Sequence, residues 1–391
     1  MLTRRRLLYA TGAAALAAAW ALRGRLAGVP ARPQTPVAPF PYVVREIAFA
    51  QPAADLALAG SLTLPRTPGP HPAIVLVPGS GPVDRDGTLA GHRFYLVLAD
   101  ALTRRGFAVL RSDKRGLGAS GGDFASATTL DFAADLRAAL AFLRALPEID
   151  GARIGLAGHS EGALVATMVA AEDARIAFTV LMAANGIPMG EVLAERLRRF
   201  APPGQSAQAL ERELALQRAV FAAATAPGSD AARSAAVRGL YQDARARYGR
   251  PFSEEEFAAF LTPWMRTLLG IDPQPLLRRI RGPVLALAGD RDRVVPPDDN
   301  LPALGRALAA NPRAELRRLP RLNHFFQTAE RGEPSEVEEI EETMAPAALE
   351  LIASWSARQA GLARTSGAGA SARPGLAMHP HTINVNDDFG S

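Results

Sequence analysis

The sequence predicts an α/β protein with a mostly parallel sheet that helices cover on both faces. Apolar runs of strand length alternate with helical patterns from residue 45 to residue 357, as in strands that are joined by helical crossovers. One run, residues 73–77, is apolar throughout, which is typical of a strand buried on both faces. The chain has 391 residues, 48% of them hydrophobic and 21% charged, so it is long enough for one large domain with an insertion.

Eight strands are expected, and the first two should form an antiparallel hairpin. Each is a short run rich in Val, Ile, Leu or Phe that is followed by turn residues. The expected strands are residues 47–49, 56–64, 73–77, 107–111, 154–157, 178–182, 284–288 and 314–319.

Helices are expected between these strands and after the last one. Phe132, Leu136, Leu140 and Leu143 recur at helical spacing, so residues 131–146 should form an amphipathic helix. The other expected helices are residues 94–105, 163–171 and 336–355.

A helical insertion interrupts the alternation of strands and helices. Residues 186–275 are rich in Ala, Arg and Glu, and proline-containing turns at Pro202, Pro227 and Pro251 should divide them into about four helices. We therefore expect a cap inserted into an α/β core of residues 45–185 and 276–358.

The two ends of the chain lie outside this core. Residues 1–31 have three consecutive arginines near their start, at residues 4–6, then an uncharged stretch, and they end in small residues. This pattern resembles a twin-arginine export signal. An uncleaved inner-membrane anchor is the alternative, although the stretch is short for a membrane span. Residues 32–44 are expected to be a Pro-rich linker. Residues 359–391 are rich in Gly, Ala and Ser and are expected to be a disordered tail.

The distribution of charge excludes a nucleic-acid-binding protein. The net charge is +5, but residues 1–40 hold six arginines and no acid, so the rest of the chain carries 5 − 6 = −1. Binding to a phosphate backbone requires cations clustered on the folded body.

The chain has no cysteine, which excludes disulfides and thiolate metal sites, and we expect neither a metal nor a cofactor.

The pattern Gly-x-Ser-x-Gly occurs twice, in two different contexts. Ser120 is not preceded by a strand, so we interpret its segment as a loop. Ser160 lies between an apolar strand and an apolar helix. A tight strand-to-helix turn holds the serine above the sheet edge in a strained conformation, and flanking glycines avoid Cβ clashes. We predict that Ser160 is a nucleophile; the alternative is an ordinary turn with a serine N-cap.

A serine nucleophile requires a histidine that accepts its proton. His324 follows the last expected strand, where the base lies when the chain order is Ser, Asp, His. We predict that His324 is the base and that the His159 side chain points elsewhere. The remaining histidines are expected in turns, at a helix start or in the tail: His71, His92, His379 and His381.

The acid should follow the preceding strand, where two carboxylates compete. The spacing Gly-x-x-Asp-x-x-Val-Pro favours Asp292, which leaves Asp290 as a turn residue and the alternative acid. The acid would hold the His324 ring and stabilise the imidazolium. An oxyanion hole needs two backbone N–H donors, for which we predict Glu161, after the nucleophile, and Ser80, in the glycine-rich loop after the third strand.

Several motifs together resemble the α/β-hydrolase superfamily. They are Gly158-His159-Ser160-Glu161-Gly162, Asp113-Lys114-Arg115-Gly116-x-Gly118-x-Ser120, Gly289-x-x-Asp292-x-x-Val295-Pro296 and Asn323-His324-Phe325. The loop Pro78-Gly79-Ser80-Gly81-Pro82 and the residues after it are similar to a bacterial serine carboxylesterase branch of the EstD type. The resemblance covers roughly residues 45–357. It implies the α/β-hydrolase fold and ester hydrolysis through an acyl-enzyme, with Ser160, Asp292 and His324 as the triad.

The function expected is therefore that of an exported, periplasmic or secreted carboxylesterase that acts on a small-molecule acyl ester. A serine peptidase or a thioesterase with the same triad is the alternative, because one triad serves many acyl substrates. An acyltransferase and a non-catalytic binding protein are further alternatives.

Overall fold

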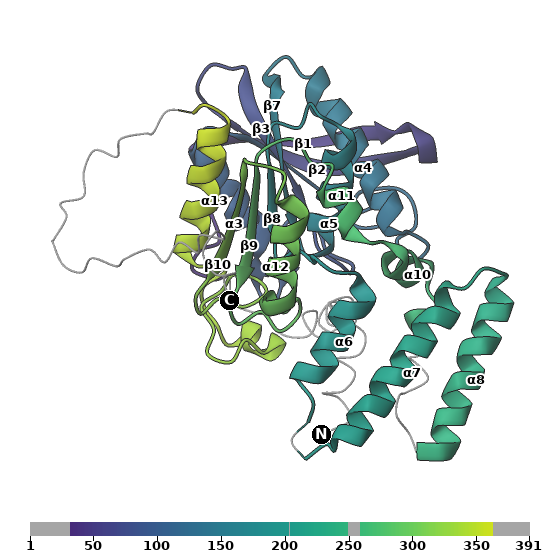
Figure 1. Ribbon diagram of the computed structural model, residues 1–391. Coiled ribbons are helices and arrows are strands. Elements are labelled where there is room, and N and C mark those ends of the chain that lie inside the picture. Colours follow the sequence, from purple (N-terminus) through teal and green to yellow (C-terminus); the bar gives the residue numbers. More distant parts are fainter. Residues whose placement is uncertain (1–31, 203, 249–258, 363–391) are drawn as a thin grey trace, which may run out of the picture.

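The computed structural model describes residues 32–202, 204–248 and 259–362, and its centre is an eight-stranded sheet (Figure 1). The strand order is β1-β2-β6-β3-β7-β8-β9-β10. The strands are β1 (Tyr42–Gln51), β2 (Leu56–Pro65), β3 (His71–Val77), β6 (Ala108–Ser112), β7 (Ile149–His159), β8 (Thr179–Met182), β9 (Val284–Gly289) and β10 (Ala314–Leu319).

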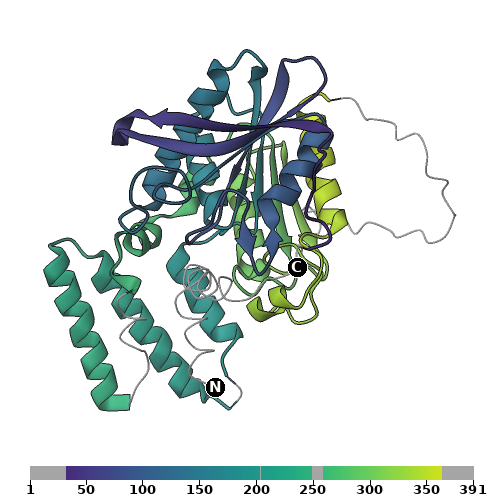
Figure 2. The same cartoon turned by 180° about the vertical axis from the view of Figure 1, so that it is seen from behind.

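Six neighbouring strands run parallel to one another, in the order β6, β3, β7, β8, β9 and β10. Strand β2 runs antiparallel to both of its neighbours, β1 and β6. The β1–β2 hairpin lies at one edge of the sheet (Figure 2). The prediction of a mostly parallel eight-stranded sheet with an antiparallel first pair is confirmed. A small second sheet, β4 (Thr88–Leu89) with β5 (His92–Arg93), was not expected, because two-residue strands leave no periodic pattern in a sequence.

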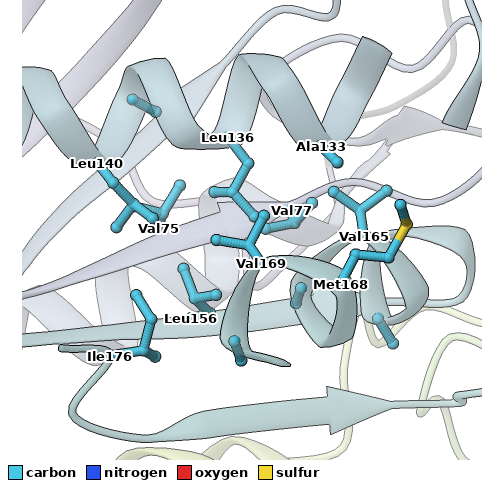
Figure 3. Close-up of a cluster of buried hydrophobic side chains, with 14 of the residues drawn as sticks. Val75, Val77, Ala133, Leu136, Leu140, Leu156, Val165, Met168, Val169 and Ile176 are labelled. Carbon is cyan, nitrogen blue, oxygen red and sulfur yellow. The ribbon is translucent and has the colours of Figure 1, made fainter. Parts of the chain in front are cut away.

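Helices cover both faces of the sheet (Figure 1). Alternate residues of β3 point to opposite faces. Val75 and Val77 belong to a buried cluster with side chains from α4 (Thr129–Ala145) and α5 (Glu161–Glu172) (Figure 3). The same cluster includes side chains from α12 (Pro297–Leu308). Ile74 and Leu76 belong to a second cluster with side chains from α3 (Phe94–Arg104) and α13 (Pro346–Gln359). The two clusters hold the central strands rigidly between helical layers.

The cap follows β8 and precedes β9. Its helices are α6 (Met189–Arg199), α7 (Ala207–Thr225), α8 (Asp230–Tyr248), α10 (Pro263–Gly270) and α11 (Pro273–Leu277). Figure 1 shows α6, α7 and α8 projecting beyond one end of the sheet. Pro202 separates α6 from α7, and Pro227 separates α7 from α8, as the sequence predicts. Pro251 lies outside the described residues.

The last helix begins later than predicted. Residues 336–355 were expected to be helical, but α13 starts at Pro346, which occupies the first turn. A proline has no N–H and disfavours helix in the residue before it, so it starts a helix rather than continuing one. Glu336 lies instead in a short 3-10 helix, Pro334–Glu338, and its carboxylate accepts hydrogen bonds from the N–H groups of Glu330, Arg331 and Glu333.

The segment expected to be a linker contacts the body. Strand β1 begins at Tyr42, so residues 42–44 are strand, and the Arg32 guanidinium donates to the carbonyl oxygens of Ala90 and Glu338. The predicted export signal, residues 1–31, and residues 363–391 of the predicted tail lie outside the described residues. In the part that is described, no helix is long and apolar enough to cross a membrane.

Candidate active site

Ser160 lies at a strained turn between β7 and α5. Its φ is 56°, in the left-handed region that non-glycine residues rarely adopt. The turn is too tight for side chains on either flank. A Cβ atom on Gly158 would lie 2.2 Å from the Gly162 carbonyl oxygen, and one on Gly162 would lie 2.1 Å from the Val77 carbonyl oxygen. The glycines therefore permit the close packing that holds Ser160 at the end of β7.

The Ser160 hydroxyl does not cap the helix that follows it. Ser160 occupies the N-cap position of α5, yet its side chain makes no capping hydrogen bond. The other Gly-x-Ser-x-Gly serine differs. Ser120 is buried, and its hydroxyl accepts from the Ala59 N–H at 2.9 Å and donates to the Asp113 carbonyl at 2.9 Å. Its hydroxyl therefore has a structural role, whereas that of Ser160 is available for chemistry.

The structure brings His324 and Asp292 together. The Nδ1 atom of His324 lies 2.8 Å from Oδ2 of Asp292, and both side chains are buried. The other oxygen of Asp292 accepts the N–H groups of Val294 and Val295, each at 2.8 Å. Asp290 points elsewhere, and its carboxylate accepts the Arg321 N–H at 2.6 Å. Of the two candidate acids, only Asp292 contacts the histidine.

This contact determines which nitrogen of His324 can act as a base. A carboxylate accepts hydrogen bonds, so Nδ1 carries the proton, and in the neutral ring Nε2 then has a free lone pair. Nε2 is buried and has no hydrogen-bond partner among the described residues. Among the described residues, Ser160 and His324 form no hydrogen bond with each other. Such bonds are often long before substrate binds.

His159 joins the serine turn to the histidine loop, a role that the sequence did not predict. Its Nε2 atom donates to the His324 carbonyl oxygen at 2.9 Å, and the two rings have centroids 4.8 Å apart. Its Nδ1 then accepts from the Tyr95 hydroxyl at 3.4 Å. Burial lowers the pKa of His159 to about 3, so its ring stays neutral. No motif predicts this role, because it depends on a contact across 165 residues.

The two other described histidines lie away from Ser160. His92 is buried in β5, where its ring bonds the Thr343 hydroxyl and the Val337 carbonyl, each at 3.0 Å. Burial lowers its pKa to about 4. His71 is the first residue of β3, whereas the sequence placed it in a turn before that strand. His379 and His381 lie outside the described residues.

The glycine-rich loop after β3 packs against the serine turn. A Cβ atom built on Gly79 would lie 3.3 Å from Cβ of Ser160. The Gly79 N–H donates to the Tyr95 hydroxyl at 2.9 Å, whereas the N–H groups of Ser80 and Glu161 donate to no group within residues 32–202, 204–248 and 259–362. The two predicted oxyanion donors thus lie in segments that touch one another, and both are free to bind.

The Glu161 carboxylate connects this region to the cap. It is buried, and Oε1 accepts from the Thr129 hydroxyl and from Nε1 of Trp264 in α10, both at 2.7 Å. Met265 and Phe260 pack in the hydrophobic core of the cap. The residues that are described hold no cluster of side chains suited to a metal.

Comparison with known proteins establishes the family. The model of the alpha/beta hydrolase family matches residues 74–339. Esterase EstD of Thermotoga maritima is 34% identical over 143 residues, so the chain matches about a third of the length of this curated relative (34%) and a similar share of its own (36%).

Two solved structures share the fold at low identity. A hypothetical protein, PA2218, from Pseudomonas aeruginosa is 19% identical with a TM-score of 0.51, covering 83% of this chain and 96% of that one. The α/β hydrolase GrgF from a Penicillium species is 18% identical with a TM-score of 0.51, covering 82% of this chain and all of that one (100%). By its family match and its fold, the chain belongs to the α/β hydrolase family.

Proposed function

We propose that this protein is a serine esterase that cleaves carboxylic esters through an acyl-enzyme. One observation carries the proposal. His324 is held by Asp292 through Nδ1, which leaves its buried Nε2 unpartnered among the described residues, in a loop that contacts the turn of Ser160. A buried base without a partner beside a strained serine is the arrangement that activates a hydroxyl.

The reaction proceeds in two halves. Nε2 of His324 takes the Ser160 proton as Oγ attacks the ester carbonyl carbon, and the N–H groups of Ser80 and Glu161 stabilise the oxyanion. The imidazolium gives its proton to the leaving alcohol, and the acyl group remains on Ser160. Water then attacks the acyl-enzyme as His324 takes its proton, and the acid departs with Ser160 regenerated. Asp292 stabilises the imidazolium throughout.

We propose an ester rather than another acyl substrate because the chain is similar to Esterase EstD. The match to Esterase EstD covers only part of both chains, so we propose the activity rather than transfer it. A thioesterase or a serine peptidase would use the same groups, and an acyltransferase would replace water by another acceptor. We also propose that residues 1–31 direct export to the periplasm or beyond, because of their arginine-rich start and uncharged stretch.

The test compares turnover of p-nitrophenyl acetate by the wild type and by Ser160→Ala. We expect kcat to fall by about three orders of magnitude or more in the variant. The matched control is Ser120→Ala, which removes the serine of the other Gly-x-Ser-x-Gly segment and should keep kcat within about threefold.

The same assay with thioesters and amides of one acyl group separates the related activities. We expect esters to be cleaved with the highest kcat/KM. An Ser160→Ala variant that keeps more than a tenth of wild-type turnover would remove Ser160 from the mechanism. A higher kcat/KM for an amide or thioester would change the substrate class.

A further inference from the structure

Lys114, the single lysine of the chain, lies buried beneath the proposed site. It follows β6 and has 6% of its surface exposed. Its Nζ atom donates to the Gly79 carbonyl oxygen at 2.6 Å and lies 3.6 Å from Oε2 of Glu161. The ammonium also lies over the Phe132 ring, 4.3 Å from its centroid. These contacts connect Lys114 to the segments of both proposed oxyanion donors.

The contact with Gly79 determines where the Ser80 N–H points. The Gly79 carbonyl and the Ser80 N–H belong to one planar trans peptide unit, in which the C=O and N–H bonds point in opposite directions. By holding the carbonyl on one side, Lys114 turns the N–H to the other. The preceding peptide is held as well, because the Gly79 N–H donates to Tyr95. Both peptide planes around Gly79 are thus fixed.

The contact with Glu161 ties the same ammonium to the second oxyanion donor. Oε1 of Glu161 is held by Thr129 and Trp264, while Oε2 is buried without a hydrogen-bond partner within the described residues, so Lys114 supplies its charge partner. Burial lowers the pKa of Lys114, and the Glu161 carboxylate opposes this shift. One buried ammonium therefore contacts the Gly79 carbonyl, which shares a peptide unit with the Ser80 N–H, and the carboxylate of Glu161, whose backbone N–H is the other proposed donor.

A buried ion pair adds little stability by itself, because removing two charges from water costs about as much as their attraction returns. Stability alone is therefore a poor reason for this lysine. We propose that Lys114 is a positioning residue of the oxyanion hole, which orients the Ser80 N–H through the Gly79 carbonyl and aligns it with the start of α5 through Glu161. This inference rests on the proposed function.

The experiment uses the full chain and three variants: Lys114→Met, Glu161→Gln and the double variant. Lys114→Met leaves a buried carboxylate unpaired, so we expect it to have the lowest Tm of the three variants. The double variant removes both charges and keeps an amide oxygen for Thr129 and Trp264, so its Tm should recover toward that of Glu161→Gln. It still lacks the bond to the Gly79 carbonyl.

We expect kcat for p-nitrophenyl acetate to be about 10- to 100-fold lower in the double variant than in Glu161→Gln, with KM changed less than threefold, because the bond acts on the transition state. The matched control is Arg115→Met. It removes the neighbouring buried cation, which pairs with Asp131 and Asp135; Tm should fall while kcat stays within about threefold.

Three results would overturn the inference. A double variant whose kcat is within threefold of Glu161→Gln would show that Lys114 serves stability alone, and so would a double variant that stays unfolded while Glu161→Gln folds. An Arg115→Met variant with an equal loss of kcat would show that the effect is not specific to Gly79. A wild type without Ser160-dependent turnover would instead overturn the proposed function itself.

Discussion

Two carboxylates lie within three residues of each other after β9, and their contacts separate their roles. Asp292 is 2% exposed and directs one oxygen to His324 and the other to two backbone N–H groups. Its orientation is therefore fixed from both sides. The Asp290 carboxylate accepts a hydrogen bond from the Arg321 backbone N–H, and this bond joins the loop after β9 to the loop after β10. The sequence spacing favoured Asp292, and the geometry supplies the physical reason.

Substituting these two residues should give unequal effects. Asp292→Asn places an amide against Nδ1, which favours the wrong tautomer of His324, and we expect kcat to fall by roughly 10⁴-fold. Asp290→Asn keeps an oxygen for the Arg321 N–H and should change kcat less than threefold. Initial rates with p-nitrophenyl acetate, together with Tm for both variants, make the comparison. The opposite order of losses would assign the acid to Asp290.

Some residues of the site could be predicted from the sequence and others could not. Ser160, Asp292 and His324 each follow a strand within a recognisable motif. His159 and Lys114 also belong to such motifs, but their roles could not be predicted, because these come from contacts with segments far along the chain. Tyr95 belongs to no quoted motif and accepts a hydrogen bond from the Gly79 N–H.

The turn between β7 and α5 is the element on which the site depends. Its glycines allow the end of β7, the start of α5 and the end of β3 to approach within distances that a Cβ atom would block. The contact between Gly162 and Val77 also brings Glu161 toward the loop that contains Ser80. Local sequence therefore determines how the two proposed donors are spaced.

Gly162→Ala should disturb stability and activity together. The new Cβ would meet the backbone oxygens of Val77 and Pro78 at 2.1 and 2.6 Å, and backbone atoms cannot yield as a flexible side chain does. We expect the free energy of unfolding to fall by about 1–3 kcal/mol and kcat to fall at least tenfold. Urea unfolding and initial rates measure the two effects.

The matched control for this prediction is Gly239→Ala. Gly239 lies inside α8, and a Cβ atom there would meet no atom within 4 Å. The free energy of unfolding should rise by about 0.5–1 kcal/mol, because alanine favours helix over glycine. A Gly162→Ala variant as stable and active as the wild type would mean that the turn is looser than described.

Element boundaries were harder to predict than elements. The long apolar strands and the amphipathic helix α4 follow clear periodicities, and Thr128 and Asp131 form a capping box at the start of α4. The predicted helix over residues 336–355 is wrong before Pro346, where the segment forms a short 3-10 helix and a turn. The carboxylate of Glu336 instead organises a turn there, through hydrogen bonds to backbone N–H groups nearby.

Across the whole molecule, topology explains why distant motifs meet. Strands β3, β7, β8, β9 and β10 are consecutive neighbours and run parallel, so the loops that follow them lie at one edge of the sheet. Ser80, Ser160, Asp292 and His324 all belong to such loops. The strand order therefore explains why motifs that lie far apart in the sequence meet at one edge of the sheet. The contact of Trp264 with Glu161 could not be predicted, because it depends on how the cap lies on the core.

The central claim is that Ser160 is the residue that becomes acylated, and covalent labelling tests it most directly. The wild-type protein is inactivated with diethyl p-nitrophenyl phosphate and digested, and the modified peptide is identified by mass spectrometry. We predict one diethylphosphoryl group, carried by Ser160, with none on Ser120 and none on the Ser160→Ala variant. A label on another residue, or an inactivated protein without a label on Ser160, would contradict the account.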